Sequence, residues 1–145
     1  MKKEVVILIA EDDPGHASLI KKNLKRAGIS NKIIHFTDGQ QVLDFILQNK
    51  TEDEFTEKSY LLLLDIRMPK VDGVEVLRQI KQDQELKKIP VIMITTTDDP
   101  KEVNACHKLG CSTYIVKPID YEQFIRAIRQ LGLFLSVVEV PSLDK

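Results

Sequence analysis

Residues 61–69 read LLLLDIRMP, and this stretch decides the fold of the chain. Four consecutive apolar residues without alternation are compatible with a piece of buried helix or with a strand covered on both faces. The run is short and ends at Asp65 and at Met68-Pro69, which favours the strand. A strand with two apolar faces is typical of a parallel sheet that has helices on both sides.

Outward from this strand, short apolar runs and segments of helical periodicity alternate along the chain. The other predicted strands are residues 5–10, 32–36, 91–94 and 113–116, and the predicted helices are residues 14–27, 39–48, 73–84, 100–109 and 122–131. Several helices begin at a pattern that supplies an N-cap acceptor: Asp13-Pro14, Asp72, Asp99-Pro100 and Asp120. This alternation predicts an α/β fold of the (βα)5 type with right-handed crossovers. For five strands it indicates a doubly wound, flavodoxin-like parallel sheet in the order 2-1-3-4-5.

Composition indicates one globular domain. The 145 residues are enough for one substantial core, and fractions of 43% apolar and 30% charged residues are ordinary for a folded protein. The net charge of -1 lacks the basic excess of nucleic-acid binders, and no apolar run approaches the roughly 20 residues that span a bilayer. We therefore expect a cytoplasmic protein that binds neither nucleic acid nor membrane, with Cys106 and Cys111 as buried free thiols. Residues 49–59 are polar without a clear period and predict a surface loop.

Polar side chains follow four different strands, at the point where each strand ends. Glu11 and Asp12 follow the first strand, Asp65 follows the third, Thr95 the fourth and Lys117 the fifth. Ligands of open parallel sheets bind at the carboxyl ends of the strands, near the point where the strand order reverses. The acids, the hydroxyl and the ammonium are therefore expected to meet at one edge of the sheet.

This set of groups has a consistent chemical use. Clustered carboxylates repel one another unless a cation joins them, and Mg2+ suits oxygen ligands while keeping several waters. Asp65 would then be a nucleophile that forms an acyl phosphate, and Lys117 and the metal would neutralise charge on the transferring group. Taken singly, Asp65 is also compatible with a helix cap and Lys117 with a surface lysine, but their joint placement favours phosphoryl transfer.

The motif at residues 65–73, Asp-Ile-Arg-Met-Pro-Lys-Val-Asp-Gly, resembles the D-x-x-M-P-x-x-D-G segment of response-regulator receiver domains. The resemblance extends to Glu11-Asp12, to Thr95 in Ile-Thr-Thr and to residues 114–118, Tyr-Ile-Val-Lys-Pro, and it covers about residues 4–132. It implies a receiver domain of a two-component phosphorelay. Such a domain is a phosphoacceptor switch and not an enzyme, and its partner is a sensor histidine kinase or a phosphotransfer protein.

The resemblance also implies a role for each residue of the metal site. Asp65 would be the phosphoacceptor and a Mg2+ ligand, and Asp12 would be a second direct ligand. Glu11 would hold the metal through water, and the backbone carbonyl of Arg67 would complete the protein ligands.

Further residues are implied to act on the phosphoryl group or to report it. Thr95 would hydrogen-bond the group and move towards it, and Lys117, directed by a cis bond to Pro118, would pair with it. Tyr114 would be the switch aromatic that turns inward when Thr95 moves. Arg67 and Thr97 occupy the two variable positions that tune phosphoryl lifetime; neither orients water well, so we expect slow hydrolysis.

Residues 133–145 form an apolar C-terminal tail, in which no output domain such as a helix-turn-helix fits. The tail resembles that of single-domain regulators paired with cyanobacterial phytochromes, which implies a phytochrome-type kinase as partner. We expect a homodimer through the tail and through the face built from residues 100–109, 113–116 and 122–131, because exposed apolar surface usually marks an interface. A tail that folds back on its own domain is the alternative.

Other classes of protein fit the residues less well. A haloacid-dehalogenase-like phosphatase needs a second acid two residues after its nucleophile, where this chain has Arg67. A flavodoxin-like cofactor binder needs a Ser-, Thr- and Gly-rich loop after the first strand, where Glu11-Asp12-Asp13 would repel a phosphate. A histidine phosphotransfer protein is a helical bundle, whereas His16 begins a helix in an α/β pattern.

Overall fold

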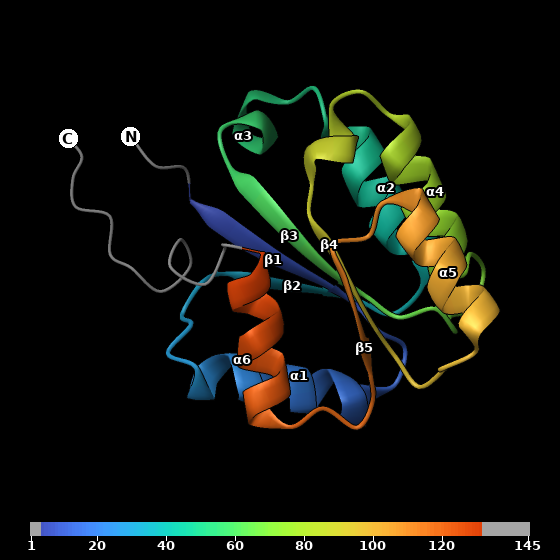
Figure 1. Cartoon of the computed structure of the whole chain (residues 1–145). Coiled ribbons are helices and arrows are strands. Elements are labelled where there is room, and N and C mark those ends of the chain that lie inside the picture. Colours follow the sequence, from blue (N-terminus) through green and yellow to red (C-terminus); the bar gives the residue numbers. More distant parts are fainter. Residues whose placement is uncertain (1–3, 132–145) are drawn as a thin grey trace.

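A computed structural model describes residues 4–131 and shows a five-stranded parallel sheet (Figure 1). The strand order is β2-β1-β3-β4-β5, which confirms the predicted doubly wound arrangement. Neighbouring strands pair in parallel, so all carboxyl ends point to the same edge of the sheet. The strands are β1 (Val5–Ala10), β2 (Ile33–Phe36), β3 (Ser59–Leu64), β4 (Val91–Thr95) and β5 (Thr113–Val116).

Helices cover both faces of the sheet, as Figure 1 shows. Helices α1 and α6 pack on one face, and α2, α4 and α5 pack on the other together with the short helix α3 and the 3-10 helix η1. An aspartate caps each of the five longer helices through a side-chain oxygen that accepts a backbone N–H. The helices are α1 (Pro14–Arg26), α2 (Gly39–Asn49), α3 (Asp53–Thr56), α4 (Gly73–Gln82), η1 (Leu86–Lys88), α5 (Pro100–Leu109) and α6 (Tyr121–Gln130).

The leucine run belongs to β3, the central strand. Leu61 and Leu63 join the apolar cluster under α1 and α6, whereas Leu62 and Leu64 join the cluster on the opposite face. Each of these side chains is at most 1% exposed. Full burial of one leucine contributes about 1.5–3 kcal/mol, so both layers are anchored on this strand.

Residues 49–59 differ from the predicted surface loop. They contain α3, and β3 begins at Ser59, two residues before the leucine run. Phe55 is buried, and its ring stacks on that of Tyr60 with centroids 4.3 Å apart. One apolar residue among charged neighbours gives no period, but this ring is enough to fix the segment on the core.

The helix after β3 is shorter than predicted. It ends at Gln82 because the side chain of Asp83 accepts the backbone N–H groups of Glu85 and Leu86 and starts η1. Leu86 then packs into the core, so η1 is a separate short element beyond the predicted end of the helix.

Cys106 and Cys111 are buried free thiols as predicted, and burial raises the pKa of Cys106 to about 11. None of the helices within residues 4–131 is both long and apolar enough to cross a bilayer. The apolar tail at residues 133–145 lies outside the described part of the chain.

Candidate functional site

The carboxyl edge of the sheet brings together the polar residues that follow its strands. Glu11 and Asp12 lie directly after β1, Asp65 directly after β3 and Lys117 directly after β5, while Thr95 is the last residue of β4. Because β1, β3 and β4 are neighbours, residues far apart in the sequence become adjacent here. The strand order therefore brings these five residues to one edge of the sheet, as predicted.

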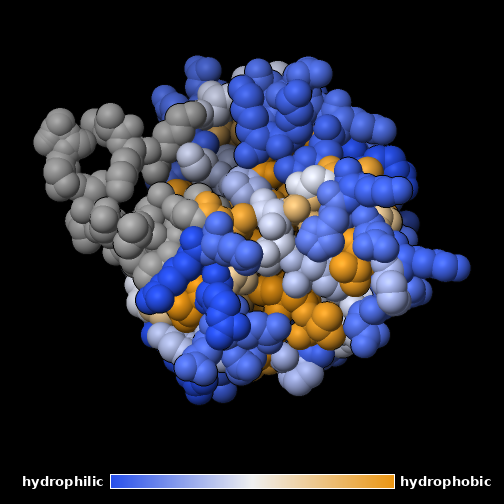
Figure 2. Space-filling view, viewed as in Figure 1, coloured by the Kyte–Doolittle hydropathy of each residue, from blue (hydrophilic) through white to orange (hydrophobic). Residues whose placement is uncertain are grey.

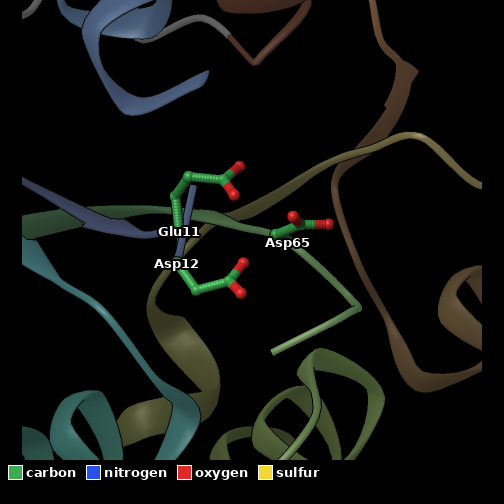
Figure 3. Close-up of side chains that lie close together, drawn as sticks. All are labelled: Glu11, Asp12 and Asp65. Atoms are coloured by element: carbon green, nitrogen blue, oxygen red, sulfur yellow. The ribbon is translucent and has the colours of Figure 1, made fainter. Parts of the chain in front are cut away.

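Three carboxylates converge at this edge (Figure 3). Glu11, Asp12 and Asp65 each offer an oxygen, and these oxygens lie within 4.8 Å of one another. Glu11 and Asp65 are buried, whereas Asp12 is exposed and leaves the cluster open to solvent. Clustered carboxylate oxygens with an open side suit a hard divalent cation that keeps some of its waters.

Lys117 supplies the positive charge of the site. Its Nζ donates to Glu11 Oε1 and lies 3.2 Å from Asp65 Oδ2, and the Lys117 side chain is only 4% exposed. Burial raises the pKa of Glu11 to about 7, against the opposing effect of the hydrogen bond from Lys117. The ammonium of Lys117 thus keeps Glu11 and Asp65 side by side, although two buried carboxylates would otherwise repel each other.

Backbone contacts fix the position of Asp65. Its Oδ1 accepts the N–H of Ile66 at 2.7 Å, and its own N–H donates to the carbonyl of Ala10 in β1. Gly73, at the beginning of α4, lies so close that an added Cβ would stand 2.0 Å from the carbonyl oxygen of Asp65. A side chain at position 73 would therefore push α4 away from Asp65.

Thr95, at the end of β4, has an unsatisfied buried hydroxyl. The residue is fully buried, and its Oγ1 has no hydrogen-bond partner among the described residues. A buried donor without a partner is costly, so such groups often serve a ligand. The backbone carbonyl of Thr95 accepts the N–H of Lys117, which keeps the ends of β4 and β5 together.

A second network lies beside the carboxylates. Arg67 Nη2 and Thr97 Oγ1 both donate to Glu102 Oε1 in the first turn of α5, at 2.9 and 2.8 Å. Tyr114 in β5 donates its hydroxyl to the backbone carbonyl of Thr97 at 2.9 Å. Burial raises the pKa of Tyr114 to about 12, so the phenol stays a donor. The loops after β3 and β4 are thereby tied to α5 and β5.

The sequence left several neighbours of the site unassigned. His16 in α1 contacts Lys117, Glu102 binds both residues of the predicted lifetime pair, and Gly73 permits the close approach of α4. His16 follows Asp12 by four residues, which is the one sequence signal that could have linked it to the acidic pair. Glu102 is an acid in the first turn of a helix, and in a sequence such a residue indicates only that it stabilises the helix.

The predicted cis bond between Lys117 and Pro118 is present.

Comparisons with known proteins agree with this geometry. The family model of the response regulator receiver domain matches residues 7–129. Response regulator Rcp1 of Synechocystis sp. is 34% identical over 138 residues, which cover 94% of this chain and 93% of that protein.

Solved structures extend the match to three dimensions. A response regulator receiver domain from Rhodospirillum rubrum has 42% identity and a TM-score of 0.75, with 97% of this chain and 99% of that chain covered. The Mn2+-bound form of Rcp1 has 31% identity and a TM-score of 0.70 over 97% of this chain and 99% of that chain. The phosphorylated cyanobacterial phytochrome response regulator RcpA has 26% identity and a TM-score of 0.72, with both chains fully covered.

We predict that divalent cations stabilise this protein through the three carboxylates. Metal ligands must be ionised, and Glu11, with a pKa of about 7, retains its proton increasingly as the pH falls below that value. The rise in melting temperature on adding Mg2+ should therefore be larger at pH 8 than at pH 6, which thermal unfolding measures. Asp12→Asn should reduce the rise, and Asp53→Asn, at an exposed residue of α3, should not. An equal rise at both pH values and in both variants would contradict the assignment.

Proposed function

This chain belongs to the response regulator receiver family of two-component signalling, and on that premise we propose that Asp65 accepts a phosphoryl group from a histidine kinase. The observation that carries the proposal is the convergence of Asp65 with Lys117 and two further acids at the sheet edge. Covalent modification of Asp65 makes the protein a switch rather than an enzyme, because no external substrate is turned over.

The transfer uses groups that are already in place. An oxygen of Asp65 bonds to phosphorus as the bond from phosphorus to the donor's histidine nitrogen breaks. The electron pair leaves with the imidazole, which takes up a proton. Lys117 neutralises charge on the phosphoryl oxygens, and the unpaired hydroxyl of Thr95 donates to one of them.

Mg2+ is the cation that we propose for the acidic cluster. Asp12, Asp65 and the backbone carbonyl of Arg67 would be direct ligands, and Glu11 would act through water. When bound, the ion would neutralise negative charge on the transferring group. The buried, closely spaced oxygens of Glu11 and Asp65 support a divalent cation in general, and the Mn2+-bound form of Rcp1 is a related case.

Tyr114 would carry the signal away from the site. Its hydroxyl holds the carbonyl of Thr97, two residues beyond Thr95, and its half-buried ring packs on the core. A shift of Thr95 towards a phosphoryl group would move this loop and with it the bond to Tyr114. The conformation of Tyr114 would then report phosphorylation to the surface formed by α5, β5 and α6.

The expected partner is a phytochrome-type histidine kinase in the cytoplasm. Support comes from the similarity to Rcp1 and to the phytochrome response regulator RcpA. A net charge of -1 offers no electrostatic attraction for nucleic acid, which agrees with signalling through protein contacts.

The first prediction of this proposal is phosphorylation at Asp65 in the presence of Mg2+. Intact mass should rise by one phosphoryl group after treatment with a small phosphodonor such as acetyl phosphate, and Asp65→Asn should abolish the rise. Lys117→Ala should slow the reaction roughly 100-fold, as expected for loss of one charge-stabilising donor. Undiminished uptake in Asp65→Asn at another residue would refute the proposal.

A second proposal concerns self-association through the α5–β5–α6 face. Figure 2 shows apolar side chains at the surface over β5, between α5 and α6. Val103 in α5, Val116 in β5 and Ile125 in α6 are partly exposed. β5 is also an edge strand of the sheet, so this face offers unpaired backbone groups as well as apolar area. The tail at residues 133–145 would add to the interface.

We predict a two-fold dimer that a charge on this face disrupts. Light scattering over a range of concentrations, with and without phosphorylation, should show a dimer for the parent protein and a monomer for Ile125→Glu. The matched control is Leu47→Glu, because Leu47 is an exposed apolar residue on α2, away from the face. A monomer under all conditions for the parent protein would exclude the interface.

Phosphoryl lifetime is the third part of the proposal. Hydrolysis needs a water in line with phosphorus, and Arg67 and Thr97 flank that approach. Arg67 has only donors, and the hydroxyl of Thr97 already donates to Glu102 and accepts the backbone N–H of Asp99, so neither side chain is a base that could take a proton from water. The pairing with Glu102 also offsets the charge of the guanidinium, which weakens its ability to stabilise the transition state of hydrolysis. A long-lived phosphoryl form follows.

Substitutions that orient the water should shorten this lifetime. Arg67→Asn and Thr97→Glu should each accelerate decay of the phosphorylated protein roughly tenfold, the value of one added hydrogen bond to the attacking water. Decay is measured by following intact mass after removal of the phosphodonor. Arg78→Asn, a surface change on α4, serves as the control. Unchanged or slower decay in both variants would show that water positioning does not limit hydrolysis.

A further inference from the structure

His16 touches the buried lysine of the site. Its Nδ1 lies 2.9 Å from Lys117 Nζ, although 101 residues separate the two in the sequence. The imidazole projects from the first turn of α1 and is 39% exposed, so it lies between the buried lysine and solvent. Its Nδ1 lies farther from the acids around it, at 4.0 Å from Glu11 Oε2 and 3.9 Å from Asp13 Oδ2. Lys117 is therefore its hydrogen-bond partner.

The chemistry of the two groups fixes the direction of this bond. An ammonium donates three protons and accepts none. Nδ1 must accordingly be the nitrogen without a proton, and the ring proton lies on Nε2. The three protons of Lys117 then have three acceptors in Glu11, Asp65 and His16.

His16 differs from the other two acceptors in charge. Glu11 and Asp65 are carboxylates of the proposed metal site, Asp65 as a direct ligand and Glu11 through water, so a bound cation competes with Lys117 for their oxygens. A neutral imidazole is a poor ligand for a hard cation and does not offset the charge of the ammonium. His16 can therefore hold Lys117 in place while leaving its positive charge available to a phosphoryl group.

We propose that His16 is a positioning residue for phosphoryl transfer, which acts by accepting a hydrogen bond from Lys117 through Nδ1. The inference rests on the proposed phosphorylation of Asp65. Position 16 therefore requires a neutral acceptor at the place of Nδ1, and a residue that lacks one leaves a buried ammonium proton without a partner.

Two substitutions of His16 separate the acceptor from the rest of the side chain. In His16→Asn, the amide oxygen occupies nearly the place of Nδ1, whereas His16→Leu keeps similar bulk and has no acceptor. With acetyl phosphate and Mg2+, the rate of mass gain should fall roughly tenfold in His16→Leu and should stay within about twofold of the parent rate in His16→Asn. Thermal unfolding of each variant checks that the fold is retained.

A double-substitution cycle tests whether His16 acts through Lys117. If it does, adding His16→Leu to Lys117→Ala should not slow phosphorylation further, because the partner of the hydrogen bond is already absent. Equal slowing by His16→Leu in both backgrounds would overturn the proposal, as would a parent rate in His16→Leu alone. Equal loss in His16→Leu and His16→Asn would also overturn it, because the acceptor would then be irrelevant.

The failure of this inference is distinguishable from that of the proposed function. If the parent protein gains no phosphoryl group at Asp65, the proposed function fails and the role of His16 in it fails with it. If the parent protein is phosphorylated and His16→Leu reacts at the parent rate, only the role of His16 fails.

Discussion

The site at the carboxyl edge of the sheet depends on one interaction, the contact of the buried Lys117 ammonium with the buried carboxylates of Glu11 and Asp65. Glu11 and Asp65 end neighbouring strands and stand close enough to repel, and Lys117 reaches both from β5. Removing charges from water is costly, and a buried pair that loses one partner is strongly destabilised. The sheet can therefore bring the acids together only because a strand on the far side of β4 supplies the compensating charge.

The two apolar layers of the core also hold the carboxylates in position. Because β3 is buried on both faces, its carboxyl end is held by two cores at once, and Asp65 cannot move without disturbing one of them. Gly73 brings the beginning of α4 against the backbone of Asp65, and the N–H of Gly73 donates to the carbonyl of Ile66. The Asp65 carboxylate is thus placed by packing from both sides of the sheet.

Much of this arrangement could be predicted because it depends on strong local patterns. The leucine run, the aspartate caps and the polar residues after each strand each have one dominant physical meaning, and the parallel topology converts them into a site. The segment around Phe55 was missed because a single buried ring among charges has no period. His16 and Glu102 were missed because their partners lie on other elements, so only the assembled fold shows what they bind. The lifetime pair was identified from the resemblance, whereas the carboxylate that joins its members became visible in three dimensions.

Glu102 gives helix α5 a mechanical property. One of its oxygens receives donors from the loops after both β3 and β4, so the amino end of the helix is tethered to the loops that carry Arg67 and Thr97. The ten residues of α5 extend about 15 Å, since each residue of an α-helix adds about 1.5 Å. A rigid helix that rotates about its tethered end moves least at that end and most at the opposite end. A rotation of these loops that carried the helix with it would therefore displace the loop after α5, which begins at the left-handed residue Gly110, more than the first turn.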